Sequence, residues 1–258
     1  MKKSRGLIGS ILLLFLMLWL PLGQQGFLVD HWMKIGTYAI PFMLMGVFLM
    51  HESNDFGALL KNYRFVGVLM LIAYITHQFE EHWIDLYGNY YAFYEFNNNF
   101  ILGKLGAPDS PIRPLTKESI FIINTTLVWL VGILGILSSP KHLFPLIAMA
   151  SIIIVNGLVH ILAAIATLQY NPGLLTSVMV FIPLYFWFLR FILNQNKKHK
   201  KLIAGGIIWA FLAHIIMVCG LLMTNWFNLF SEAVYFVALV IWSVIPMALF
   251  RLKRLPST

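Results

Sequence analysis

The chain contains 258 residues, of which 60% are hydrophobic and 11% are charged. A soluble globular domain is typically about half apolar and about a quarter charged, so this composition excludes an ordinary soluble domain and indicates a protein that crosses a membrane several times. The net charge of +8 comes from basic residues in short loops beside apolar segments, a pattern that sets topology and argues against a nucleic-acid partner.

About eight apolar segments predict membrane-spanning helices, because about 20 apolar residues cross a ~30 Å hydrocarbon core and no alternating pattern of barrel strands is present. The first segment has no clear small-x-small cleavage site after it, so we expect an uncleaved helix rather than a signal peptide. The predicted fold is an all-α, polytopic membrane helical bundle that forms one domain over residues 1–258. In chain order the predicted helices cover residues 7–23, 36–51, 65–84, 118–138, 143–167, 174–193, 202–224 and 233–250.

The distribution of basic residues predicts the orientation of this bundle. With the N-terminus in the cytoplasm, the outer loops receive only Lys34, Lys104, Arg113 and Lys117 of the 18 lysines and arginines. Because basic residues concentrate in cytoplasmic loops, we expect both termini inside and a location in the cell membrane, with the lipid bilayer as the main partner. The short second helix is required for this pattern, although Pro41 makes it the least regular. The sequence does not indicate an oligomeric state.

The loop over residues 85–117 is long for an outer connection and opens with six aromatic residues between Tyr87 and Phe96. Amphipathic rings are favoured at the membrane–water boundary, so this stretch predicts a segment that lies in the interface. The proline-containing end of the loop predicts irregular structure. Such a loop can act as a lid over a site or as a plain connector.

The third predicted helix carries an unusual polar cluster, THQFEEHW, at the end of an otherwise apolar run. At ~100° per residue, Glu80 lies about 60° to one side of His77 and Glu81 about 40° to the other side. One face therefore offers an imidazole and two carboxylates at i, i+3 and i+4, a spacing that can bind a metal. His82 points roughly 140° away and is expected to lie outside this face.

The fifth predicted helix supplies a partner, since Asn156 and His160 share one of its faces at i, i+4. The third and fifth helices both run from inside to outside. At ~1.5 Å per residue, Glu81 lies ~24 Å and His160 ~26 Å above the start of their helices, so both can lie at one level. His214 stands by itself near the middle of the seventh predicted helix and is not assigned to the site.

These residues predict a divalent metal site, for zinc or iron, because ionisable groups inside a membrane cost about 2.5–3.5 kcal/mol each and are therefore candidates for function. We expect His77, Glu81 and His160 to be the ligands and Glu80 to be the catalytic general base, although the two acids could exchange roles. The single Cys219 excludes a cysteine-based site. Residues expected to orient the ligands or contact a substrate are Tyr74, Asp85, Asn124, Asn156, Asn171 and Thr176.

Three functions are open at this point. The cluster could serve a metal-dependent, hydrolase-like membrane enzyme that acts on a lipid or another apolar substrate. It could instead receive protons or a cation in a transporter or binding protein, although the sequence contains no internal repeat. It could also bond helices together in an accessory membrane protein, with no chemistry of its own.

The order of three motifs resembles a known family. HQFEE at residues 77–81, NGLVH at 156–160 and YNPGLLTS at 170–177 together resemble the HXXEE family of bacterial multi-pass membrane proteins. The resemblance covers roughly residues 65–195 and leaves residues 1–64 and 196–258 as flanking helices. The family is named for its motif and has no characterised function. The resemblance therefore implies His77, Glu80 and Glu81 as site positions but implies no chemistry, cofactor or substrate.

Overall fold

The structure is a computed structural model that describes residues 26–49, 56–139 and 141–249. Within these ranges every named element is a helix, and the one strand-like contact is an isolated bridge between Ile84 and Tyr90. The all-helical prediction is therefore confirmed for this part of the chain, while the first predicted helix, 7–23, lies outside it. In chain order the elements are α2 (Phe27–Leu49), α3 (Phe56–Leu59), α4 (Tyr63–His82), α5 (Ala92–Lys104), α6 (Lys117–Ile123), η2 (Asn124–Leu130), α7 (Val131–Ser138), α8 (Phe144–Thr167), α9 (Leu174–Thr176), η3 (Ser177–Phe181), α10 (Ile182–Gln195), η4 (Lys197–His199), α11 (Lys200–Leu221), η5 (Leu222–Trp226) and α12 (Glu232–Leu249).

Among the described residues, four continuous helical stretches are long and apolar enough to cross a membrane. They correspond to the fourth to seventh predicted helices and support a membrane protein, whereas the total of eight spans and the side of each terminus stay predictions. Three of the stretches contain a π-helical segment, η2, η3 or η5, a geometry that often occurs at functional sites. The four stretches are Lys117–Ser138, Phe144–Thr167, Leu174–Gln195 and Lys197–Trp226, and Glu232–Ala248 is a shorter apolar helix.

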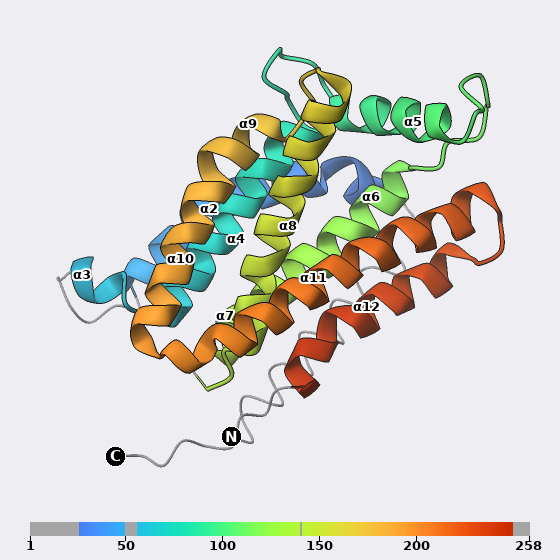
Figure 1. Cartoon of the computed structure of the whole chain (residues 1–258). Helices are drawn as coiled ribbons and strands as arrows, with labels where there is room; N and C mark the ends of the chain where they lie inside the picture. Colours follow the sequence, from blue (N-terminus) through green and yellow to red (C-terminus); the bar gives the residue numbers. More distant parts are fainter. Residues whose placement is uncertain (1–25, 50–55, 140, 250–258) are drawn as a thin grey trace.

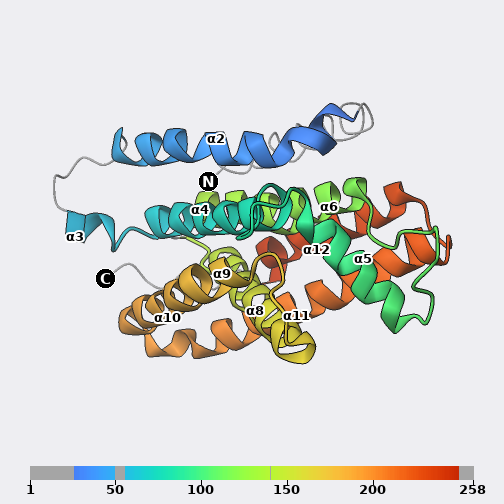
Figure 2. The ribbon, with the colours of Figure 1, turned by 90° about the horizontal axis from the view of Figure 1, so that it is seen from above.

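The first half of α8 forms the centre of the bundle. Every residue from Phe144 to Ile154 is buried, and α7, α10 and α11 pack against this helix (Figure 1). Gly206 lets α11 approach closely, because a Cβ atom there would lie 2.7 Å from Ser151 Oγ and 2.8 Å from Ile147 Cγ2. Seen from above, α2 lies at one edge of the bundle beside α4, and α11 and α12 lie together away from α2 (Figure 2).

The second predicted helix differs from the observed one at its start. We expected it to begin near residue 36, but α2 begins at Phe27. Asp30 and Lys34 interrupt the apolar pattern of its first turns, and for this reason a hydropathy criterion misses them. Packing supplies the missing stabilisation, since Trp32 and Met33 are buried against the core, and Asp30 forms an ion pair with Lys117 at 3.3 Å.

The outer loop is more ordered than the sequence predicts, because α5 runs across the end of the bundle (Figure 1). Tyr87 and Tyr90 are exposed, which fits a segment at a membrane boundary, although that location stays a prediction. The buried Asn98 side chain fixes the end of the loop. Its Nδ2 donates to the Leu115 carbonyl oxygen at 2.9 Å, and its Oδ1 accepts from the Leu115 amide at 2.9 Å. The Asn98 side chain thus makes both backbone hydrogen bonds of Leu115 that another segment of backbone would otherwise have to make.

Candidate metal centre

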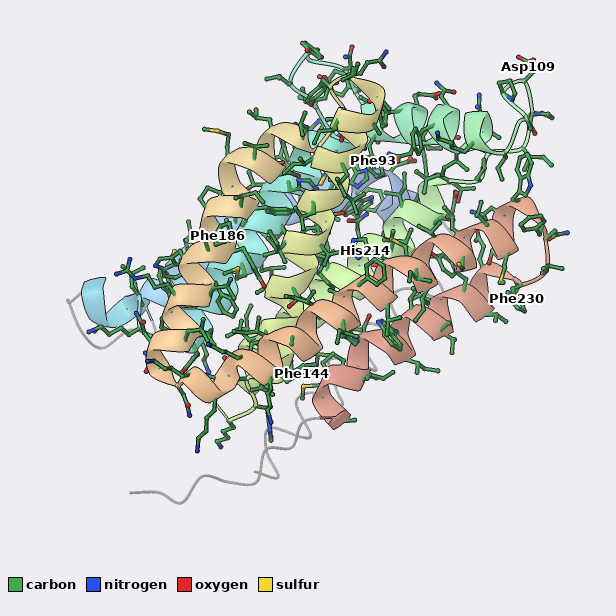
Figure 3. The ribbon with its side chains drawn as sticks, viewed as in Figure 1. Phe93, Asp109, Phe144, Phe186, His214 and Phe230 are labelled. Atoms are coloured by element: carbon green, nitrogen blue, oxygen red, sulfur yellow. The ribbon has the colours of Figure 1, made fainter. Side chains whose placement is uncertain are left out.

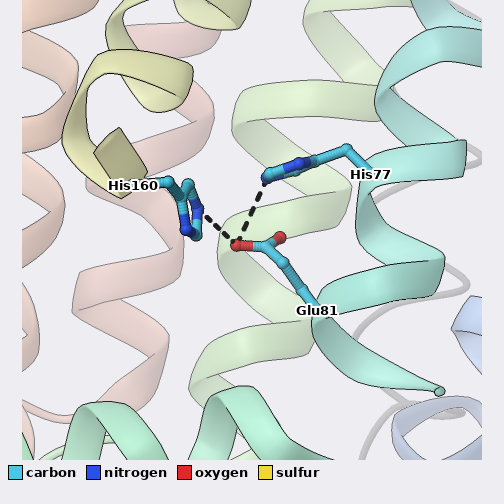
Figure 4. Close-up of side chains that lie close together, drawn as sticks. All are labelled: His77, Glu81 and His160. Carbon is cyan, nitrogen blue, oxygen red and sulfur yellow. Dashed lines mark ion pairs between the residues drawn. The ribbon is translucent and has the colours of Figure 1, made fainter. Parts of the chain in front are cut away.

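The three residues predicted as metal ligands come together in the structure. His77 and Glu81 lie one turn apart on α4, and His160 reaches them from α8 (Figure 4). Glu81 Oε1 lies 3.0 Å from His160 Nε2 and 3.4 Å from His77 Nε2, and all three side chains are buried. One ligand atom from each residue can be chosen so that all three lie within 4.8 Å of one another. Two imidazole nitrogens and one carboxylate oxygen form a usual donor set for zinc or iron.

The turn between α8 and α9 covers this cluster with bare backbone. Gly173 has a φ of +97°, in the left-handed region that glycine adopts readily. A Cβ atom at this position would lie 2.7 Å from His160 Cε1 and 2.8 Å from His77 Cε1. Glycine is therefore required here both by the backbone conformation and by the space that the two imidazoles occupy.

Asn171 fixes the orientation and tautomer of His160. Its Nδ2 donates to the His160 carbonyl oxygen at 2.9 Å, so its Oδ1 faces His160 Nδ1 at 2.6 Å. Since an amide oxygen can only accept, Nδ1 must carry the hydrogen. In the neutral ring the lone pair then lies on Nε2, which faces Glu81. This is the arrangement by which proteins prepare a histidine to bind a metal.

His77 is oriented in the same sense through Thr176. The Thr176 hydroxyl lies 2.6 Å from Glu80 Oε2 and 2.7 Å from His77 Nδ1. A carboxylate can only accept, so the hydroxyl donates to Glu80 and accepts from His77 Nδ1. The Nε2 atom of His77 is then an acceptor, and Asn156 Nδ2 lies 2.9 Å from it. Both histidines thus place Nε2 near Glu81 Oε1, and the Asn156 amide lies against the His77 nitrogen at the same point.

Glu80, the predicted general base, is held by a different set of contacts. Its Oε1 accepts from the Tyr170 hydroxyl at 2.9 Å and from the Leu175 amide at 3.0 Å, and its Oε2 accepts from the Thr176 amide at 2.7 Å as well as from the Thr176 hydroxyl. Burial raises the pKa of the Tyr170 phenol, which keeps this group a donor. The contacts make Glu80 an acceptor for the backbone at the start of α9 and a support for His77, and its role as base stays a prediction.

Replacing Thr176 by valine should weaken metal binding by ~10–100-fold, the usual effect of losing a group that orients a ligand. Valine fills a similar volume but cannot accept from His77 Nδ1 or donate to Glu80. Titration calorimetry with Zn²⁺ measures the effect. Thr176→Ser keeps the hydroxyl and is the matched control, expected to bind as the natural chain does. Equal affinity of the valine and serine variants would contradict this orienting role.

Of the other residues predicted around the site, one packs against a candidate ligand, one reaches the cluster through His82 and one lies away from it. The Tyr74 ring packs edge-on against His77, with ring centroids 5.7 Å apart. Asn124 reaches the cluster only through His82, whose Nε2 lies 3.3 Å from its Nδ2. Asp85 is not brought to the cluster, because it accepts from the amides of Tyr87 and Asn89 and shapes the turn after α4.

The helical angle predicts that His82 lies outside the site face, yet His82 Nε2 lies 3.3 Å from Glu81 Oε2. The backbone angle is correct, but the flexible Glu81 side chain bridges the two faces. A chain of hydrogen bonds leads to His82 through Asn124. Trp129 Nε1 donates to Gln78 Oε1 at 3.0 Å, and Gln78 Nε2 donates to Asn124 Oδ1 at 2.8 Å. Two polar residues at i, i+4, Gln78 and His82, were the sequence signal for this second face.

A cavity of about 110 Å³ opens beside Glu81 and His82. Its walls come from α4, α5, the stretch from α6 to η2, α8 and α11, and most of its lining is aliphatic. Asn156 and His214 also line it. His214 stands alone in the sequence, which does not assign it to the site, and the packing of α11 against α8 brings it to the cavity. The turn at Gly173 therefore closes the cluster on the side of the two imidazoles, and Glu81 faces the cavity on the other side.

Comparison with known protein families gives a match over the middle of the chain. A family model described as "Protein of unknown function with HXXEE motif" matches residues 68–188. The matched segment runs from α4 into α10 and contains His77, Glu81, His160 and Gly173. No curated protein and no solved structure matches the chain. The family resemblance is confirmed over this segment, and the description of the family carries no activity.

Proposed function

We propose that this chain, whose residues 68–188 match the HXXEE family model, binds a divalent cation such as zinc or iron and acts as a membrane enzyme on a lipid or another apolar substrate. The ligands would be His77, Glu81 and His160. The observation that carries the proposal is the common direction of two imidazole Nε2 atoms, each set by a separate hydrogen bond at Nδ1, toward one carboxylate oxygen. A purely structural network requires contacts, but it does not require both rings to turn Nε2, a nitrogen that metals bind, toward the same carboxylate oxygen.

Three protein ligands suit a catalytic site, because such sites keep a further coordination position for water or substrate. When bound, the cation would polarise a carbonyl or phosphoryl oxygen, or lower the pKa of a water molecule. The turn at Gly173 closes one side of the cluster, so the cavity gives access from the other side. Asn156 lines that cavity and its amide can hold a polar group of the substrate near the ligands.

Proton transfer in this proposal is assigned to His82 rather than to Glu80. His82 lines the cavity and contacts the Glu81 oxygen that does not face the other two histidines. The oxygens of Glu80 already accept four hydrogen bonds, and these contacts would have to break before the carboxylate took a proton from a substrate. Glu80 as base, which the sequence predicts, is the alternative, and a Glu80→Gln variant that keeps activity would argue against it.

Metal analysis of the purified full chain tests the proposal. After loading with Zn²⁺ or Fe²⁺ and dialysis, we expect about one metal ion per chain in the natural protein and none in His77→Ala, because this change removes one of three ligands. His199→Ala is the control, since His199 lies at the opposite end of the bundle on η4 and contacts the Ile192 carbonyl oxygen. Absence of stoichiometric metal in the natural chain would overturn the proposal.

A further inference from the structure

The cavity beside the cluster has the character of a ligand site rather than of a packing defect. On the same measure of volume, a single water molecule needs roughly 10–15 Å³, so about 110 Å³ exceeds the space for one or two waters. Leucine, isoleucine, valine, alanine and methionine make up just over half of the lining, and carboxylate, imidazole and amide groups come from Glu81, His82, Asn97, Asn124, Asn156 and His214. Small-molecule sites share this composition of apolar walls and few polar groups. Phe93 on α5 and His214 on α11 both line the cavity, and both lie beside α8 in Figure 3.

The polar groups divide the cavity into chemically different parts. Glu81, His82 and Asn156 lie where it meets the cluster of candidate ligands. Ile101 and Leu115 line it near α5, and Met217 and Leu221 line it along α11. A molecule that fills this space therefore needs an aliphatic body and an oxygen-bearing end. The narrow volume leaves room for one chain segment rather than for the paired chains of a diacyl lipid.

We propose that the cavity binds the aliphatic chain of a single-chain lipid, with its carboxyl, ester or alcohol end at Glu81, His82 and Asn156. This inference rests on the proposed function for the reaction at that end, but not for binding of the chain. His214 contributes a polar contact along the chain: its Nδ1 donates to the Ala210 carbonyl oxygen at 2.8 Å, which leaves Nε2 of the neutral ring as an acceptor.

Ala213 provides the means to close the cavity without touching the cluster. It is fully buried on α11, lines the cavity and has no polar side-chain group. Phenylalanine at this position would place a ring in the space that the chain is proposed to occupy. Leu212 is the matched control, because it is the neighbouring residue on the exposed face of α11 and Leu212→Phe adds a ring outside the bundle.

The test uses palmitic acid that carries a photoreactive diazirine, added to the full chain in detergent and irradiated, with labelled peptides identified by mass spectrometry. We expect labels on cavity-lining residues of α5, η2 and α11, competition by plain palmitic acid, and at least a tenfold loss of labelling in Ala213→Phe. Leu212→Phe should label as the natural chain does. Ala213→Leu replaces the phenylalanine variant if that variant does not fold.

Labels confined to outward residues of α11, or labelling undiminished in the Ala213 variants, would overturn the inference. Parallel metal analysis separates it from the proposed function. Specific labelling of a chain that holds no metal would support the lipid site and contradict the proposed metal-dependent enzyme. Stoichiometric metal without specific labelling would support the metal site and contradict the lipid site.

Discussion

Replacing Glu81 by glutamine should reduce metal affinity by at least roughly 100-fold, beyond the ~10–100-fold effect of groups that merely orient a ligand. Glu81 is the one carboxylate in the cluster of candidate ligands, and its two oxygens contact the Nε2 atoms of His77, His160 and His82 at 3.0–3.4 Å. Glutamine keeps the shape but removes the negative charge that balances a divalent cation. Titration calorimetry with Zn²⁺, supported by metal analysis, measures the loss.

Thermal unfolding of the same variant separates a metal site from a structural network. A ligand at 100 times its dissociation constant stabilises the folded chain by about 2.7 kcal/mol, so Zn²⁺ should raise the melting temperature of the natural chain and leave Glu81→Gln unchanged. If the cluster only bonds α4 to α8, the variant should melt earlier by the same amount with and without Zn²⁺. Glu95→Gln is the control, because Glu95 is exposed on α5. A glutamine variant that retains tight metal binding would contradict the ligand assignment.

The candidate ligands could be predicted from the sequence because a helix fixes the angle and the rise of every residue. The spacing of His77 and Glu81 places them on one face of α4, and counting residues from the start of each helix brings His160 to the same level. The same reasoning placed Asn156 and Thr176 near the cluster, where each contacts His77. These residues depend on helix geometry and on one short turn, and both are local properties of the chain.

The remaining parts of the site depend on contacts that the sequence does not encode locally. The Glu81 side chain bends toward His82, so an angle measured at the backbone does not exclude that histidine. Glu80 binds the backbone amides of Leu175 and Thr176, and only the packing of α9 against α4 reveals this. The start of α2 and the whole of α5 are also stabilised by tertiary contacts, among them the Asn98 hydrogen bonds, and their sequences are too polar for an apolar pattern to predict helices there.

Replacing Gly173 by alanine should disrupt the cluster more than any other single methyl addition near it. The new Cβ atom would meet His160 Cε1 at 2.7 Å and His77 Cε1 at 2.8 Å, and the backbone would have to hold a φ of +97°. Both imidazoles must then move away from Glu81, or the turn must change and withdraw the Thr176 hydroxyl from His77. We expect metal affinity to fall by at least roughly 10-fold, because ligands and their supports are displaced together.

Gly88→Ala provides a control that separates backbone strain from the clash. Gly88 also has a positive φ, +82°, but nothing lies within 4 Å of an added Cβ atom. Both variants should lose about 1–2 kcal/mol of stability from the left-handed backbone alone, and only Gly173→Ala should lose metal binding as well. Chemical unfolding and Zn²⁺ titration of the two variants measure the two effects separately. Equal metal affinity in both would mean that the turn at Gly173 can move without disturbing the histidines, and the close cover that it forms over them would then have no part in holding a metal.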